Sequence, residues 1–264
     1  MTAPMESTPP SDLDDASDAA CDLSVVVPIF NEADRLRQNV EPLLSWLAAS
    51  RRPGELVLVD DGSTDGSGRL VRVLAAADPR VRGLLLRPNQ GRGRALQAGL
   101  RTARGRVVLT TEADGSWDLG CLQGMAELVR SGRADLAVAS PHRPGGGLSA
   151  VPFERAWLSR GANWLIRRLV DDELTMATGM CRAYRREVVE EILSPRAGKE
   201  FHLDVLLRAR RAGLRVVEVP ARLTWRVHPG AARRLGDAAH LSASALRHLG
   251  VLVDHLRLHW ERRP

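Results

Sequence analysis

Two carboxylates separated by one residue, Glu112 and Asp114, follow a run of β-forming residues at 105–111. Alternate side chains beyond a strand end point the same way, so this pair can share one divalent cation. Oxygen ligands suit Mg²⁺ or Mn²⁺, and magnesium usually completes its coordination with water and substrate phosphates. Acidic loop residues are common, so the pair alone is weak support for a metal site.

A second acidic pair, Asp60 and Asp61, follows an apolar run at 55–59. Two neighbouring carboxylates at a strand end repel each other unless a cation or hydrogen-bond donors offset their charge. The N–H and O–H groups of a nucleotide base or ribose would supply such donors. Asp65, in the same glycine-rich turn, is typical of an Asx turn that opens a helix whatever the function.

Glycine-flanked arginines at 91–94 mark the start of a predicted helix. Backbone N–H groups and the helix dipole favour anions at such a position, which suits a diphosphate. The segment lacks the Gly-Lys-Ser/Thr of a P-loop, which disfavours an NTPase. No G-x-G-x-x-G follows the first predicted strand, which disfavours a dinucleotide-dependent dehydrogenase.

Short apolar runs alternate with helical patterns up to residue 140, which predicts βαβ units. The expected strands are 23–29, 55–59, 81–90, 105–111 and 134–140, and the expected helices are 31–50 with Asn31 as N-cap, 67–77, 91–103 and 119–130. Such units build an α/β fold with a mostly parallel, Rossmann-like sheet and helices on both faces. Ligands of these sheets bind at the carboxyl ends of the strands, where both acidic pairs would meet.

The pattern changes after residue 140. We expect a flexible loop at 141–150, helix 152–170, an extended stretch that becomes a helix over 178–193, helix 200–213 and strand 214–220. Residues 22–228 would then form a single domain. The acidic stretch 1–21 is expected to be a disordered tail without the pattern of a secretory signal. Residues 229–264 are expected to form an amphipathic helical segment that packs on the domain or lies on a membrane surface.

The composition limits the partners. The net charge is +6 and the pI about 10.3, carried almost entirely by arginine, since Lys199 is the only lysine. This charge suits nucleic acid, an anionic membrane surface or phosphorylated substrates, but one tyrosine and three phenylalanines offer no platform for stacking bases, so nucleic acid is not expected. Three widely spaced cysteines indicate neither a disulfide framework nor a zinc site and fit a cytoplasmic protein. No stretch reaches the roughly 18 apolar residues of a membrane span, so at most peripheral membrane contact is expected.

Seven segments, in this order and spacing, carry a resemblance to a known family: SVVVPIFNEADRL, LVLVDDGSTDGS, NQGRGRALQAGL, TTEADGSW, RAWLSRGANWLIRRL, TGMCRAYRREVV and EFHLDVLLRARRAGLRVVEVP. Together they span about residues 23–226. They resemble family 2 glycosyltransferases of the GT-A fold, most of all the dolichol-phosphate or polyprenol-phosphate mannosyl- and glucosyltransferases. The resemblance implies metal-dependent transfer of a sugar, with inversion, from a GDP- or UDP-sugar to a lipid phosphate.

The resemblance also implies roles for individual residues. The positions that match nucleotide-binding residues are Pro28, Glu32, Asp60, Asp61, Arg92 and Ala113. The positions that match the metal site for Mg²⁺ or Mn²⁺ are Glu112, Asp114 and Ser116. The positions expected to act in catalysis are Asp114, Arg182 near the donor diphosphate, and Arg155 and Ser159, which match the pair that receives the lipid phosphate.

The chain departs from the family pattern mainly on the acceptor side. Pro141 stands where the family often has an arginine, although Arg143 could reach the same phosphate. Met180 and Cys181 stand where Gly-Phe is usual. At the metal site, Glu112 replaces an aspartate and so keeps a carboxylate one methylene further out.

Three alternatives therefore stay open. A soluble family 2 glycosyltransferase that uses a hydroxyl of a small-molecule natural product would share the donor half and would need a general base, for which the candidates are Asp118, Asp204 and His202. A sugar-phosphate nucleotidyltransferase would also use strand-end carboxylates, but its glycine-arginine turn should follow the first strand. A non-catalytic anion-binding module would need no paired acids.

Overall fold

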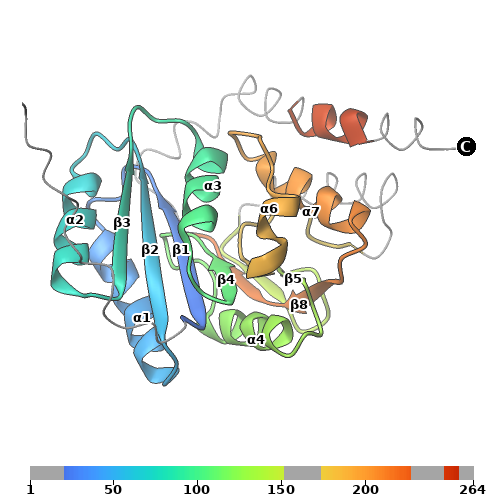
Figure 1. Ribbon diagram of the computed structural model, residues 1–264, viewed down its shortest axis with the longest axis horizontal. Helices are drawn as coiled ribbons and strands as arrows, with labels where there is room; N and C mark the ends of the chain where they lie inside the picture. The colour runs from blue at the N-terminus through green and yellow to red at the C-terminus, as the bar shows by residue number, and fades with distance from the viewer. Residues whose placement is uncertain (1–20, 152–173, 227–246, 256–264) are drawn as a thin grey trace, which may run out of the picture.

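A seven-stranded sheet forms the centre of the protein, whose computed structural model describes residues 21–151, 174–226 and 247–255 (Figure 1). The strand order is β3-β2-β1-β4-β7-β5-β8. The strands are β1 Leu23–Ile29, β2 Gly54–Asp61, β3 Val81–Leu86, β4 Val107–Thr110, β5 Leu136–Ser140, β7 Arg182–Arg185 and β8 Val216–Pro220. All run parallel except β7, which is antiparallel to β4 and β5, so the prediction of a mostly parallel sheet is confirmed.

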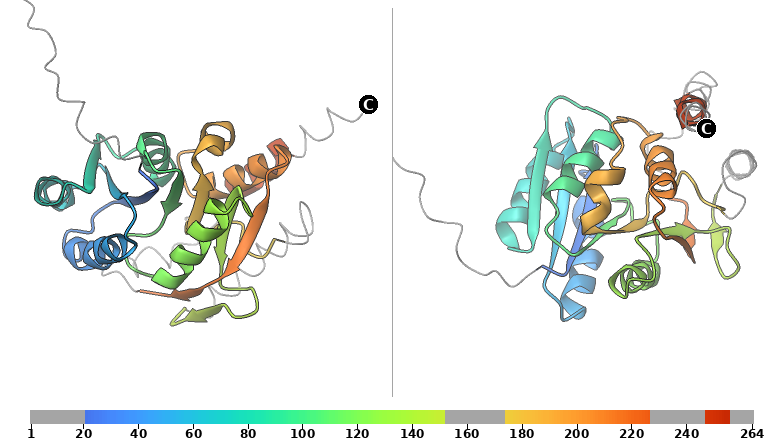
Figure 2. Two further views of the ribbon diagram at one scale, coloured as in Figure 1. Left: turned by 60° about the horizontal axis from the view of Figure 1, so that its bottom comes forward. Right: turned by 45° about the vertical axis from the view of Figure 1, so that its right-hand side comes forward.

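Helices cover both faces of this sheet, as the βαβ pattern predicts (Figure 2). The helices are α1 Leu36–Ala49, α2 Ser67–Ala77, α3 Arg92–Thr102, α4 Leu119–Arg130, the 3₁₀ turn η1 Arg186–Val188, α6 Val189–Ile192 and α7 Phe201–Arg211. α1 packs on α2, and α6 packs between α3 and α7. Val25, Val26 and Val27 of β1 are all inaccessible to solvent. Burial from both faces explains why the strands read as continuous apolar runs.

The first helix begins later than the sequence suggests. α1 starts at Leu36 and no side chain caps it, so the prediction of Asn31 as its N-cap is wrong. Asn31 instead has a left-handed φ of 56°, which asparagine tolerates better than most residues. Its Oδ1 accepts a 2.9 Å hydrogen bond from the N–H of Thr64. The side chain therefore joins the loop after β1 to the loop after β2.

Two short parallel strands, β6 Gly147–Ser149 and β9 Arg222–Thr224, form a second sheet. The sequence predicts only a loop at 141–150, because three residues are too few to show a strand period. β9 also contacts the segment after β4, since Trp117 and Leu223 form an isolated antiparallel bridge. The second sheet therefore supports the acidic segment that follows β4.

The helical residues 247–255 pack on the domain. Val251 and Leu252 are buried in the core, and His255 Nε2 lies 2.7 Å from Asp204 Oδ1 on α7. The remainder of the expected segment 229–264 lies outside the described residues, as does the predicted helix 152–170. Within the described part of the chain, no helix is both long and apolar enough to cross a membrane.

Candidate functional site

The two acidic pairs lie at the same edge of the sheet. Asp60 and Asp61 are the last residues of β2, and Glu112 and Asp114 follow β4. β1 lies between these two strands and pairs with both. The acidic pairs are therefore about two strand spacings apart, roughly 10 Å.

Glu112 is half-buried, and its Oε2 accepts a hydrogen bond from the indole N–H of Trp117. Burial raises the pKa of Glu112 to about 7; the positive charge of Arg92 opposes this increase and the negative charge of Asp114 adds to it. The two carboxylates thus repel each other in a partly desolvated place. A divalent cation bound between them would relieve this repulsion.

The loop after Glu112 has little freedom. The Ser116 N–H donates a 2.9 Å hydrogen bond to Asp114 Oδ1, and the Ser116 carbonyl accepts one of the same length from the Thr224 N–H. Ala113 and Ser116 are buried. Ser116 therefore orients Asp114 through its backbone, and the role of its hydroxyl at the metal site stays a prediction.

The carboxylates of Glu112 and Asp114 suit a metal ion that takes some of its ligands from a substrate. In residues 21–151, 174–226 and 247–255, no group of three His, Cys, Asp or Glu side chains is placed to hold a metal ion. Two carboxylates alone leave several positions of an octahedral Mg²⁺ or Mn²⁺ to water and phosphate oxygens. The pair Glu112 and Asp114 therefore suits a cation that arrives with a diphosphate.

Sequence reasoning missed a cation close to this pair. A Cβ built on Gly115 would lie 3.8 Å from the guanidinium carbon of Arg226, so this arginine lies beside the turn between Asp114 and Ser116. Gly115 has a φ of +64°, where a side chain would strain the backbone. The bare turn and the arginine together favour a phosphate next to the acidic pair.

The two residues of the second acidic pair, Asp60 and Asp61, differ in their hydrogen-bond partners. Asp61 is occupied by the protein: its Oδ1 accepts the Gln90 N–H at 2.8 Å and its Oδ2 the Gly91 N–H at 3.0 Å. Burial raises the pKa of Asp61, and these hydrogen bonds oppose the increase. Asp61 therefore fixes the β3–α3 loop, which tells against its expected contact with the nucleotide.

Asp60 is fully buried and incompletely paired. Its Oδ1 accepts a 3.3 Å hydrogen bond from the Ser63 N–H, whereas its Oδ2 has no hydrogen-bond partner among the described residues. A buried oxygen without a partner costs about 1–3 kcal/mol. A ribose hydroxyl or base N–H would satisfy it, so Asp60 is the better nucleotide-binding candidate of the two.

The loop after β1 carries Glu32 and is held by the turn after β2, whereas Pro28 is the penultimate residue of β1. The Glu32 N–H donates to Ser67 Oγ at 2.8 Å, and the Ala33 N–H donates to Asp65 Oδ2 at 2.9 Å. Asp65 Oδ1 also accepts the Ser67 N–H at 3.0 Å, which confirms the predicted Asx turn. Burial alone would raise the pKa of Asp65, but hydrogen bonds from Ser67 and Ala33 outweigh it and lower the pKa. Pro28 and Glu32 are half-buried beside this turn.

The start of α3 is only partly available for an anion. The Gly93 N–H donates to the Ala197 carbonyl at 2.6 Å, and a Cβ on Gly93 would lie 2.3 Å from the carbonyl oxygen of Arg196. The segment 194–199 thus covers one side of the helix N-terminus where we expected a diphosphate. Arg92 is exposed and its charge reaches Glu112, so its guanidinium could bind a phosphate beside the acidic pair.

Arg182 does not face the acidic edge. Its side chain is fully buried, and its Nε, Nη1 and Nη2 donate to the carbonyls of Gly179, His202 and Ala177 at 2.8, 2.7 and 2.8 Å. Burial lowers the pKa of Arg182. This position corrects the expectation that Arg182 contacts the diphosphate: the guanidinium instead joins the segment 177–179 to the start of α7.

The candidate general bases are also committed to other contacts. Asp118 is the N-cap of α4 and accepts the Cys121 N–H at 2.7 Å. Asp204 lies in a buried contact with His255 and 3.1 Å from Arg208. His202 is buried, with a pKa well below its usual range because of burial and the nearby charge of Arg182. Asp204 and His202 are therefore buried, whereas Asp118 is exposed but has both carboxylate oxygens paired, since Oδ2 also accepts the Arg222 N–H at 3.1 Å.

On the acceptor side, the structure places Arg143 but not the pair expected to receive a lipid phosphate. Arg143 Nε lies 3.0 Å from Glu218, whose carboxylate also accepts the N–H groups of Thr175 and Met176. Arg155 and Ser159 lie outside the described residues. Their role stays a prediction.

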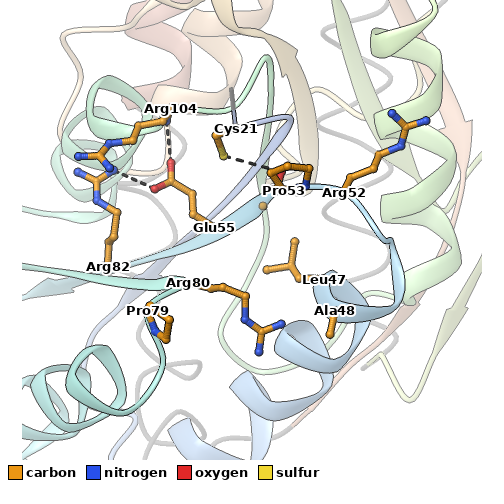
Figure 3. A pocket seen from close by; sticks show the side chains of 11 residues that line it. Cys21, Leu47, Ala48, Arg52, Pro53, Glu55, Pro79, Arg80, Arg82 and Arg104 are labelled. Atoms are coloured by element: carbon orange, nitrogen blue, oxygen red, sulfur yellow. Dashed lines mark hydrogen bonds and ion pairs between the residues drawn. The ribbon is translucent and has the colours of Figure 1, made fainter. Parts of the chain in front are cut away.

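A pocket of about 390 Å³ lies at the opposite end of the strands, lined by residues that precede or begin β1 to β4 (Figure 3). Several of these residues are arginines, but acidic partners offset much of their charge. Arg82 lies 2.9 Å from Glu55, and Arg80 lies 2.6 Å from Asp78. The pocket shares no residue with the acidic edge and forms a separate feature of the fold.

The fold and the acidic edge define a class of protein. A family model described as Glycosyl transferase family 2 matches residues 24–193, and the chain belongs to this family. It is therefore a glycosyltransferase. This excludes the nucleotidyltransferase and the non-catalytic module among the alternatives.

Particular relatives agree with this class. A polyprenol monophosphomannose synthase of Mycolicibacterium smegmatis is 37% identical over 209 residues, which are 76% of this chain and 77% of the relative. An undecaprenyl-phosphate mannosyltransferase of Micrococcus luteus is 32% identical over 201 residues, or 74% and 80%. Glucosyl-3-phosphoglycerate synthase from Mycobacterium tuberculosis, solved with Mn²⁺, UDP-glucose and phosphoglyceric acid, has a TM-score of 0.64 at 19% identity over 90% of this chain and 80% of that one. This likeness confirms the GT-A class of fold.

Proposed function

We propose that this glycosyltransferase moves a hexose, with inversion, from a UDP- or GDP-sugar to a polyprenyl phosphate. The observation that carries the proposal is the pair Glu112 and Asp114 at the carboxyl edge, in a chain 37% identical to a polyprenol monophosphomannose synthase. Two half-buried carboxylates close to each other are suited to a cation and a diphosphate. We propose both the nucleotide of the donor and the requirement for a divalent metal ion.

The donor would extend along the acidic edge. Asp60 would bind the nucleoside through its unpaired Oδ2, with Pro28, Glu32 and Ala113 beside it. Glu112 and Asp114 would hold Mg²⁺ or Mn²⁺, which supplies positive charge for the departing diphosphate. Arg92 and Arg226 would add positive charge at the same phosphates. Ser116 would keep Asp114 in position.

The acceptor chemistry needs little from the protein. A lipid phosphate carries an anionic oxygen that can attack the anomeric carbon without a general base. Positioning by Arg155, Ser159 and Arg143 would then suffice. Asp204 and His202 are buried and Asp118 has both carboxylate oxygens paired with backbone N–H groups, which is consistent with an acceptor that needs no base.

A cytoplasmic enzyme with peripheral membrane contact fits this acceptor. Cys21, Cys121 and Cys181 are all free thiols in the structure, which suits a reducing compartment. Two relatives are named for polyprenol and undecaprenyl phosphate. An acceptor of this kind is a long-chain lipid, so the proposed enzyme would bind at a membrane surface.

A water-soluble hydroxyl acceptor is the second candidate, favoured by Pro141 at the place of a family arginine. One experiment separates the two. The purified protein would be incubated with UDP-glucose, UDP-galactose or GDP-mannose, with undecaprenyl phosphate or a cell extract freed of lipid, and with Mn²⁺ or EDTA. Mass spectrometry should detect a glycosylated undecaprenyl phosphate only with metal. A product confined to the lipid-free extract would favour the second candidate, and equal product with EDTA would refute metal dependence.

A further inference from the structure

The buried imidazole of His202 has no hydrogen-bond partner among the residues that the structure describes. His202, in the first turn of α7, is 2% exposed, and neither Nδ1 nor Nε2 has a hydrogen-bond partner within the described residues. Buried polar groups are nearly always paired, and an unpaired one costs about 1–3 kcal/mol. The imidazole therefore lies where a hydrogen-bonding ligand would stabilise it.

His202 lies at the edge of the sheet that carries the acidic pair. Its carbonyl accepts a 2.7 Å hydrogen bond from Arg182, and Arg182 pairs in the sheet with Thr110, two residues before Glu112. Arg92 is close enough for its charge to influence both Glu112 and His202. Glu112 and His202 therefore both lie within range of the charge of Arg92.

The order of these groups follows the sheet. Asp60 ends β2, Glu112 follows β4, and His202 lies beside the start of β7, in a sheet whose order is β2-β1-β4-β7. Three strand spacings separate β2 from β7, which is about 14 Å. A nucleotide sugar is ordered as nucleoside, diphosphate and sugar, so a donor with its nucleoside at Asp60 and its diphosphate at Glu112 has its sugar toward His202.

The charge state of the ring selects the kind of ligand. Burial and the charges of Arg182, Arg92, His248 and Lys199 keep the pKa of His202 well below its usual range, so the ring is neutral. A neutral imidazole offers one N–H donor and one acceptor, which matches a hydroxyl group. A phosphate would be bound better by the cations nearby. Phe201, perpendicular to the imidazole at 5.6 Å between ring centres, adds an apolar neighbour.

We infer that His202 binds a hydroxyl group of the donor sugar and so helps determine which sugar is transferred. The inference rests on the proposed function, because it takes a nucleotide sugar as the donor. It adds a residue whose partner is the sugar and not the nucleotide, the metal or the acceptor.

Calorimetry in Mn²⁺ with His202→Phe and His202→Gln tests the inference against UDP, GDP, UDP-glucose and GDP-mannose. We expect His202→Phe to bind the nucleotide sugar that the wild type prefers about tenfold more weakly, which is the loss of roughly one hydrogen bond. Binding of the matching nucleoside diphosphate should stay the same. His202→Gln, which keeps a donor and an acceptor, should recover most of the affinity. The Tm of His202→Phe should not fall, because the change removes two unpaired polar atoms; if that variant does not fold, His202→Leu takes its place.

Deoxy versions of the preferred donor identify the contact. One deoxy sugar should bind the wild type about tenfold more weakly and His202→Phe with no further loss. If His202→Phe loses affinity equally for the nucleotide sugar and the nucleoside diphosphate, or loses no affinity at all, the inference is overturned. Asp114→Asn is the reference for the proposed function: if it abolishes metal-dependent donor binding while His202→Phe binds normally, only the role of His202 fails. If Asp114→Asn binds the donor as the wild type does, the proposed function itself fails.

Discussion

Acidification should destabilise the protein through the contact between Asp204 and His255. Burial alone would raise the pKa of Asp204, but hydrogen bonds from His255 and Ser194 and the charge of Arg208 outweigh it and lower the pKa to about 2. The ordinary value is 3.8. A carboxyl whose pKa is lower in the folded state stabilises the fold above the unfolded pKa. The stabilisation disappears as the pH falls from about 4 through about 2.

The size of this effect follows from the shift. A difference of nearly two pKa units, at 1.36 kcal/mol for each unit, corresponds to about 2 kcal/mol in the free energy of unfolding at neutral pH. His255→Ala should remove about 1–2 kcal/mol of it, because His255 Nε2 makes a 2.7 Å contact with the buried carboxylate. Asp254→Asn is the matched control on the same helix. Its pair with Arg196 is exposed, so we expect a loss below about 1 kcal/mol.

Urea unfolding followed by far-UV circular dichroism measures these free energies between about pH 3 and pH 7. The wild type should lose stability steeply below about pH 4, and His255→Ala should show a lower plateau and a shallower acid limb. An acid limb of equal slope in the wild type and His255→Ala, or an equal loss in Asp254→Asn, would refute the reasoning.

Three further changes test the candidate site. Arg182→Met should lower the free energy of unfolding by about 3 kcal/mol or more in urea titrations, because three carbonyls lose a charged donor; normal stability with lost transfer would instead favour a catalytic role. Trp117→Phe should weaken Mn²⁺ binding up to about tenfold in calorimetry, since Glu112 loses the N–H that orients it, and unchanged affinity would contradict that role. Asp60→Asn should weaken nucleotide binding about tenfold, whereas Asp61→Asn should mainly lower the Tm. Weaker nucleotide binding in Asp61→Asn and a lower Tm in Asp60→Asn would show that the two roles are assigned the wrong way round.

The sequence predicts the half of the fold that rests on local periodicity. β1, β2 and α2 lie where apolar runs and helical spacing place them, because strands buried on both faces leave a continuous signal. The direction of β7 has no such signal. Arg182–Arg185 is four residues long, and its antiparallel position between β4 and β5 depends on contacts with strands that are distant in the sequence.

The candidate site, too, depends in part on contacts between residues that are distant in the sequence. Residue types and strand ends are enough to bring Asp60 and Glu112 to one edge. They do not reveal that Asp61 accepts N–H groups from the β3–α3 loop or that Arg182 turns into the core, since both depend on which backbone groups lack partners in the folded chain. Motif matching assigns a role to a position, whereas the hydrogen-bond partners decide whether the side chain is available for it.

The polar residues at this edge differ in whether hydrogen bonds within the protein already pair their side chains. Asp61 and Asp65 have their oxygens paired with N–H groups of the protein, so a ligand would gain little from them. Within the part of the chain that the structure describes, Asp60 keeps an unpaired oxygen and His202 two unpaired nitrogens, and burial raises the pKa of Glu112. Buried polar atoms without a partner, and a half-buried carboxylate beside another, make the folded protein less stable than fully paired groups would. A ligand that satisfies all three would recover that free energy on binding, so these groups are the ones at this edge that would gain most from the proposed donor.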